Sequence, residues 1–148
     1  MELKRIGMIH SPFKTREEAP KSGRLTDRLS EIEIFDEYAE GLLDIETASH
    51  LIVLYWFDRA NRDCLIVKPP RDDQPHGVFV TRSPCRPNPI AVSVVDFVER
   101  KGNRIVVKGL EALDQTPLLD VKMYNAESDS FPDATVGWLK DAEKRKKS

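Results

Sequence analysis

Short runs of alternating hydrophobic and polar residues recur along most of this chain, a pattern typical of β-strands with one buried face. The alternation predicts strands over residues 3–10, 31–35, 78–81, 90–99, 104–111 and 118–124. The run 50–57 is mostly apolar and rich in β-branched and aromatic residues, which predicts a strand buried on both faces or nearly so. Tyr38, Leu42 and Ile45 recur at helical spacing, so we expect one short helix over residues 36–45.

The order of these elements indicates the fold class. Lys101-Gly102-Asn103 separates two predicted strands and favours a hairpin. Strands follow one another closely and do not alternate with long helices, so a parallel sheet is not expected. The sequence therefore predicts a mostly β fold, in which a single sheet curls into a barrel-like domain with one or two short helices and long loops. The charged tail, residues 138–148, is expected to be frayed or loosely helical.

Composition narrows the functional classes. A chain of 148 residues fits one domain with a real core, and a net charge of −2 does not indicate a general nucleic-acid binder. No glycine-rich loop opens a helix after a strand, and the histidines lack metal-ligand spacing, so we predict neither a nucleotide loop nor a metal site. Cys64 and Cys85 are expected to be buried or idle thiols in a reducing cytosol. The chain shows neither a signal peptide nor a run of transmembrane length, so a cytoplasmic protein without a membrane partner is expected.

The most informative segment is residues 77–93, GVFVTRSPCRPNPIAVS. It holds three prolines and two arginines, Arg82 and Arg86, within eight residues. Proline fixes the backbone angle φ and restricts the residue before it, so the loop should be stiff. A stiff loop that presents two guanidinium groups is suited to an anionic ligand. The alternative is a rigid connection between strands with arginines on its surface.

The second informative segment is residues 114–124, DQTPLLDVKMY. Its first four residues form a turn whose side chains and backbone groups could bind a small polar ligand. A strand after the turn could orient a substrate or relay a proton, or it could form a salt-linked face in solvent. The period of two puts Leu119, Val121 and Met123 on one face and Asp120, Lys122 and Tyr124 on the other.

Both segments resemble the two signature blocks of the TsaA-like family, which includes the TrmO-type tRNA methyltransferases. Residues 49–60, SHLIVLYWFDRA, resemble a third block, and the similarity runs over residues 3–137. The resemblance implies that this range is a β-barrel domain that binds S-adenosylmethionine (SAM), and that the protein is a homodimer with SAM near the subunit interface. It also implies N6-methylation of threonylcarbamoyladenosine next to the anticodon of tRNA.

Matching positions imply a set of cofactor contacts. Arg82 would pair with the methionine carboxylate of SAM, since its planar guanidinium group offers two parallel donors. Backbone groups near Thr116 would contact adenine or ribose, and acidic side chains would suit the sulfonium and ammonium charges. The implied SAM contacts are Pro20, Lys21, Ser22, Asp58, Arg59, Arg82, Val92, Asp114, Gln115, Thr116 and Pro117. Asp120 and Tyr124 are the candidates for a base that removes the proton from the adenine nitrogen.

Departures from the family pattern keep alternatives open. Pro20-Lys21-Ser22 stands where Pro-Arg-Gln is usual, Asp58 stands where histidine is usual, and Gln115 replaces the common glycine of the turn. These changes motivate a second hypothesis, a SAM-binding regulatory or accessory protein without methyl transfer. A third hypothesis is a β-barrel RNA-binding module. For an enzyme acting on tRNA, residues 11–30, Arg86 and the basic tail could contact phosphate.

Overall fold

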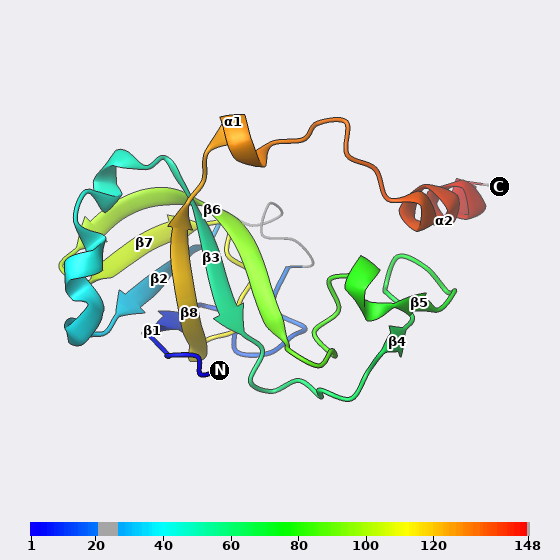
Figure 1. Ribbon diagram of the computed structural model, residues 1–148, viewed down its shortest axis with the longest axis horizontal. Coiled ribbons are helices and arrows are strands. Elements are labelled where there is room, and N and C mark those ends of the chain that lie inside the picture. Colours follow the sequence, from blue (N-terminus) through cyan, green and yellow to red (C-terminus); the bar gives the residue numbers. More distant parts are fainter. Residues whose placement is uncertain (21–26, 148) are drawn as a thin grey trace. The chain divides into compact units, whose positions relative to one another are not determined.

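The computed structural model describes residues 1–20 and 27–147. The chain folds into two compact units, Met1–Asp58 with Ile90–Tyr124 and Arg59–Pro89 with Asn125–Ser148. Six antiparallel strands of the first unit form a closed barrel in the order β1-β2-β7-β6-β3-β8 (Figure 1). The strands are β1 (Gly7–His10), β2 (Leu29–Ile34), β3 (His50–Trp56), β6 (Ile90–Lys101), β7 (Arg104–Lys108) and β8 (Thr116–Met123). The predicted mostly β, barrel-like fold is confirmed.

The core of the barrel consists of the alternate side chains that point inward from each strand. In β3 these are Leu51, Val53 and Tyr55, all 0% exposed. The side chains between them are half-buried, so the predicted strand forms with its inner face fully buried and its outer face partly exposed. The outward side chains are apolar too, which hides the alternation in the sequence. Inside the barrel, the Tyr55 hydroxyl lies 2.9 Å from that of Ser93, and burial raises the pKa of Tyr55 well above its usual range.

The hairpin between β6 and β7 forms as predicted. Lys101 pairs with Arg104, so the connection consists of Gly102 and Asn103. Gly102 has φ +63°, a left-handed conformation that costs glycine little. The Asn103 side chain donates to the Ile34 carbonyl at 2.7 Å and so joins the hairpin to β2.

Three local predictions are wrong. The helix expected over 36–45 is a pair of 3-10 helices, Asp36–Leu42 and Ile45–Thr47. The strand expected over 78–81 is a 3-10 helix, Val78–Val80, because the backbone N–H and the hydroxyl of Thr81 both donate to the Val78 carbonyl and close a tight turn. In β8 the register shifts between Leu118 and Asp120, so Leu118 points into the core and Leu119 does not share the predicted face with Val121.

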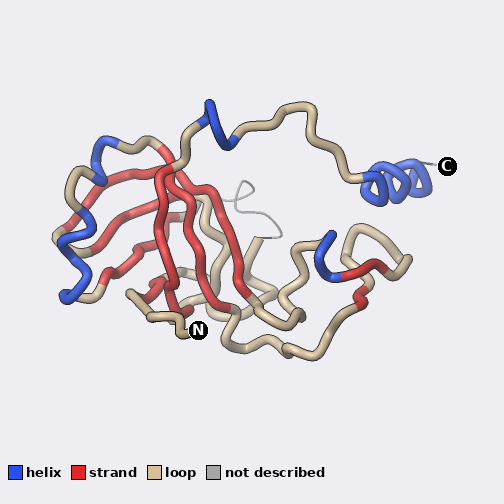
Figure 2. The backbone as a smooth tube through the Cα atoms, in the orientation of Figure 1, coloured by secondary structure: helices blue, strands red, loops and turns tan. Residues whose placement is uncertain are grey.

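The second unit contains little regular structure, and Figure 2 shows it mainly as loop. Its elements are β4 (Ile66–Val67), β5 (His76–Gly77), the 3-10 helix Val78–Val80, α1 (Ala126–Asp129) and α2 (Gly137–Lys147). The tail that we expected to be frayed or loosely helical is therefore the helix α2. None of the described helices is long and apolar enough to cross a membrane.

Candidate functional site

The arginine-proline loop, residues 82–89, belongs to the second unit, and guanidinium groups hold its backbone. Arg86 donates to the carbonyls of Thr81 and Ser83 at 3.0 and 3.1 Å. Arg62 donates to the Pro87 carbonyl at 2.8 Å. Because proline removes donors from this loop, its carbonyls depend on side chains for partners. Arg86, for which a phosphate contact was one expectation, therefore supports the backbone of its own loop. Arg62 was not singled out in the sequence, where one basic residue between turns carries no distinguishing signal.

Arg82 differs from these two arginines. Its side chain is exposed. In residues 1–20 and 27–147, no hydrogen bond or ion pair involves it. Its five N–H donors are thus available for a ligand, while the backbone that carries them is fixed by Arg86. This arrangement suits bidentate binding of a carboxylate.

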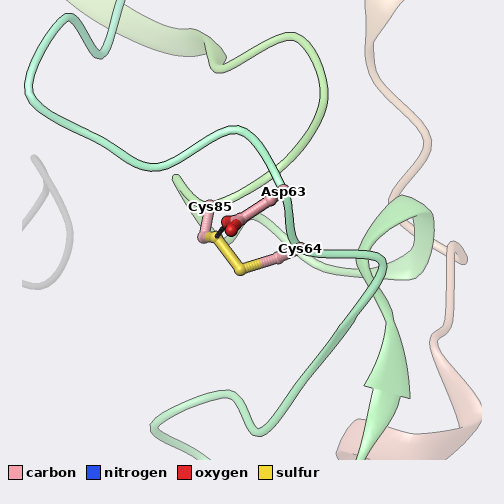
Figure 3. A group of neighbouring side chains, drawn as sticks. All are labelled: Asp63, Cys64 and Cys85. Carbon is pink, nitrogen blue, oxygen red and sulfur yellow. Dashed lines mark hydrogen bonds between the residues drawn. A yellow bond between two sulfur atoms is a disulfide. The ribbon is translucent and has the colours of Figure 1, made fainter.

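A disulfide joins Cys64 to Cys85 and links the segment after Arg59 to the arginine-proline loop (Figure 3). The prediction of idle thiols is therefore wrong. The α-carbons of the two cysteines lie 5.4 Å apart, within the usual range for a disulfide, because both loops fold back within the same unit. Asp63 Oδ1 lies 3.9 Å from the Cys85 sulfur. The ligand atoms of Asp63, Cys64 and Cys85 lie within 4.8 Å of one another, but sulfurs joined in a disulfide provide no thiolate for a metal.

In the first unit, Asp114 holds the predicted ligand-binding turn against residues 11–14. Its carboxylate accepts the Ser11 N–H at 2.8 Å and the Lys14 ammonium at 2.6 Å. Burial by itself raises the pKa of Asp114, but hydrogen bonds from Lys14, Ser11 and Gln115 outweigh that effect and lower the pKa to about 2. Asp114 is therefore an ionised part of the turn's own structure.

The rest of the turn is also bonded within the first unit. Gln115 has φ +67°, which explains why the similar turns of the family commonly place glycine there. Its N–H donates to the Ile9 carbonyl at 2.8 Å, and its side chain is exposed. The buried Thr116 hydroxyl donates to the Leu113 carbonyl at 2.7 Å. Pro117 pairs with Met8 in the barrel.

Val92 and Asp120 lie in one row on the outer face of the barrel. Leu54 of β3 pairs with Val92 of β6 on one side and with Asp120 of β8 on the other. One strand therefore separates the two predicted residues, about 10 Å in all. The outward positions next to Val92 on β6 are apolar, and Ile90 and Val94 are 42% and 45% exposed. The structure thus combines one predicted cofactor contact and one candidate base on a largely apolar surface.

The other candidate base is not on this row. Asp120 Oδ2 lies 3.0 Å from Lys122 Nζ, so these two side chains share a face as predicted. Tyr124 follows the end of β8, where its ring lies 6.2 Å from that of His50 in a tilted arrangement. The Tyr124 N–H donates to the His50 carbonyl, which continues the pairing of β8 with β3 and places Tyr124 opposite the exposed His50, on the face of Asp120 and Lys122 as predicted.

The remaining predicted contacts are dispersed. Asp58 ends the first unit and Arg59 begins the second. Both side chains are exposed, and both already have interaction partners. Pro20 is half-buried, whereas Lys21 and Ser22 lie outside the described residues.

The closed six-stranded antiparallel barrel places this chain among the small β-barrel proteins. The family model described as "tRNA-methyltransferase O N-terminal domain" matches residues 8–130. The chain belongs to this TrmO N-terminal domain family.

Individual relatives are similar over most of the chain. A protein of Archaeoglobus fulgidus described as a probable S-adenosyl-L-methionine-binding protein is 52% identical over 147 residues, 99% of this chain and 40% of that protein. The tRNA (adenine(37)-N6)-methyltransferase of Escherichia coli is 33% identical over 95% of this chain and 65% of that enzyme. The crystal structure of TrmO from Pseudomonas aeruginosa has a TM-score of 0.79 and 29% identity, covering 93% of this chain and 62% of that one. The chain therefore spans between two fifths and two thirds of the length of these three proteins.

Proposed function

We propose that this protein is a SAM-dependent methyltransferase that methylates N6 of threonylcarbamoyladenosine beside the anticodon of tRNA. Membership of the TrmO family and similarity to the Escherichia coli enzyme support the reaction. Relatives described as SAM-binding support the cofactor. The observation that carries the proposal is Arg82, whose donors have no partner among residues 1–20 and 27–147 and whose backbone is held by other arginines and the disulfide.

In the proposed reaction the sulfonium S–CH₃ bond of SAM breaks as an N6–CH₃ bond forms, and the N6 proton leaves to a base. Arg82 binds the methionine carboxylate, and the backbone of residues 114–117 contacts the adenosine part. Val92 supplies apolar surface from the outer face of the barrel. Much of the rate enhancement comes from holding the methyl group in line with the nitrogen.

Asp120 is the better supported of the two candidate bases. It lies in the same outward row as Val92, whereas Tyr124 lies past the end of the strand. To accept a proton, its carboxylate has to exchange the Lys122 ammonium for the substrate N–H. Since that ion pair is exposed, the exchange costs little.

The apolar outer face also supports the proposed homodimer with SAM near the interface. Ile90 and Val94 of β6 are exposed beside Val92, and β3 places Ile52 and Leu54 next to them. A contiguous apolar sheet face of this kind marks an interaction surface. We also propose a cytoplasmic location, because the proposed substrate is a tRNA.

The deciding assay mixes the protein with methyl-labelled SAM and tRNA that carries threonylcarbamoyladenosine. We expect label in the tRNA and a neutral thioether product. Tight SAM binding with no label in any tRNA pool would instead establish the alternative, a SAM-binding regulatory or accessory protein.

Replacing Arg82 tests the cofactor site separately. Arg82→Ala should weaken SAM binding about 100-fold, because a bidentate charged pair contributes about 3 kcal/mol. The SAM affinity of Arg82→Lys should lie between those of the wild type and Arg82→Ala, since an ammonium group cannot form two parallel hydrogen bonds. The matched control is Arg71→Ala, an exposed arginine of the same unit that should leave SAM affinity unchanged. Equal affinity of Arg82→Ala and the control in calorimetry would refute this role.

A further inference from the structure

The helix α2 carries its packed side chains on one face and three lysines on the opposite face. Trp138, Ala142 and Arg145 recur at helical spacing, and Ala142 is only 3% exposed. Lys140, Lys144 and Lys147 recur at the same spacing about half a turn away, and all three are exposed. We refer to these three residues as the lysine stripe. The first face packs within the second unit, and the lysine stripe points to solvent.

A buried carboxylate fixes this helix. The Asp72 side chain is 2% exposed, and it accepts hydrogen bonds from His76 Nε2 at 2.7 Å and from Arg145 at 2.6 Å. These bonds, first from His76 and then from Arg145, hold the pKa of Asp72 well below its usual range. A buried, ionised carboxylate that accepts two such hydrogen bonds fixes the orientation of both donor side chains.

Trp138 adds a second attachment near the start of the helix. Its ring stacks on His76 with centroids 4.5 Å apart, and its indole N–H donates to the Val80 carbonyl at 2.9 Å. Val80 lies two residues before Arg82 in the chain. The helix is therefore held at both ends against the segment that leads into the arginine-proline loop, and the lysine stripe has a fixed direction.

Interaction with the helix dipole does not account for all three lysines of the lysine stripe. Lysines near a helix C-terminus interact favourably with the helix dipole, but only within the last turn. Lys140 lies in the first half of the helix, about 10 Å along the axis from Lys147. In the part of the chain that the structure describes, none of the three forms an ion pair. Glu143 is the acidic residue nearest to the stripe on the helix surface.

We propose that the lysine stripe binds the phosphate backbone of the RNA substrate. This inference rests on the proposed function for the identity of the polyanion. A row of exposed ammonium groups suits phosphates, which are contacted through charge and without base recognition. Insertion into a membrane surface is not favoured, because Trp138 stacks on His76 and Ala142 is buried, so neither offers an apolar face to a membrane. The net charge of −2 hides this local basic surface.

The test compares two double variants of the full chain in binding to unfractionated tRNA at several salt concentrations. Lys144→Gln with Lys147→Gln should weaken binding about tenfold near 0.1 M salt and reduce the slope of log K against log salt by about 1.5. Glutamine keeps the helix propensity. The control is Lys4→Gln with Lys101→Gln, two exposed lysines of the first unit that should bind tRNA as the wild type does. SAM affinity should be the same in all three proteins.

A third variant, Asp72→Asn, tests whether the lysine stripe acts through its fixed position on the helix or through its charge alone. Asp72→Asn removes a negative charge and one partner of Arg145, so a purely electrostatic effect would tighten tRNA binding. A fixed stripe predicts weaker binding, because the helix loses its attachment. Tighter or unchanged binding by this variant would overturn the proposal.

The outcomes distinguish this proposal from the proposed function. Methyl transfer to tRNA with equal binding by both double variants overturns the lysine stripe and leaves the reaction standing. Lysine-dependent tRNA binding without methyl transfer supports the stripe and refutes the reaction. If the wild-type protein binds no tRNA at all, both are overturned.

Discussion

The barrel and the second unit are stabilised in different ways. In the barrel, continuous ladders of hydrogen bonds join six strands around a core of aliphatic side chains that are almost fully buried. The described part of the second unit has two strands of two residues each, one 3-10 helix and two α-helices. It relies on one disulfide, the buried Asp72, the Trp138 indole, and Arg62 and Arg86, whose guanidinium groups donate to loop carbonyls.

This difference matters because the second unit carries Arg82 and the lysine stripe. A core spreads its stabilisation over many contacts, so a substitution there affects the whole cooperative unit. A loop-rich unit depends on a few identifiable bonds, and the loss of one should open a local region. Substitutions in the two units should therefore differ in how far their effects spread as well as in size.

The largest effect on stability is expected from the barrel core. Leu118→Ala removes a side chain that is 0% exposed and should lower the free energy of unfolding by about 4 kcal/mol. The control is Leu119→Ala, which should cost less than about 1 kcal/mol because the register shift in β8 turns that side chain outward. Urea unfolding followed by circular dichroism measures both. A larger loss for Leu119→Ala would show that the register shift is wrong.

The next largest effect should remain inside the second unit. Cys64→Ser with Cys85→Ser, or reduction of the wild type, opens a loop with a sequence separation of 21 residues, worth about 3 kcal/mol. Hydrogen exchange should increase between residues 64 and 85 and stay unchanged in β3 and β6. An equal increase in the barrel strands would contradict the separate stabilisation of the two units.

The ionised Asp114 carboxylate should make the stability of the barrel depend on pH, with a smaller effect than the two above. The pKa of Asp114 is about 2 in the folded protein, below its unfolded value near 3.9. A lowered pKa stabilises the fold above the unfolded value, so this contribution is present at neutral pH and is lost as pH falls from about 4 to about 2. Asp114→Asn should cost about 2 kcal/mol at pH 7 and little at pH 2.

The control for this prediction is Glu17→Gln, which replaces an exposed carboxylate. It should leave the acid unfolding profile of the wild type unchanged. If Asp114→Asn gives that same unchanged profile, the carboxylate does not hold the turn.

The two units also differ in how much the sequence predicted. Period-two patterns and the Gly102 turn specify β6, β7 and their hairpin, because each strand has one face in the core. The register shift in β8 could not be predicted, since it depends on pairing with β3 and not on the pattern of β8 alone. Resemblance identified Arg82, but the supporting roles of Arg62 and Arg86 emerge only from the folded loop.

In the second unit, long-range contacts decide what the local sequence leaves open. The segment Val78–Val80 is apolar enough for a strand, and the bonds from Thr81 make it a 3-10 helix. The disulfide requires two loops to bring Cys64 and Cys85 together, for which no local signal exists. The helix α2 has few apolar residues, and its order depends on Asp72, which lies 65 positions before Gly137 in the chain.

The smallest effect on stability is predicted for Asp120, where the effect on catalysis should be large. Asp120→Asn breaks an exposed ion pair with Lys122 and should change the free energy of unfolding by less than about 0.5 kcal/mol. If Asp120 accepts the N6 proton, single-turnover methyl transfer should slow at least about 100-fold, with SAM affinity unchanged. Tyr124→Phe provides the comparison, because that side chain lies past the strand end and its loss should leave the rate within about threefold. A normal rate for Asp120→Asn would assign this row of the barrel to binding alone, and the proton would then have to leave to solvent or to another group.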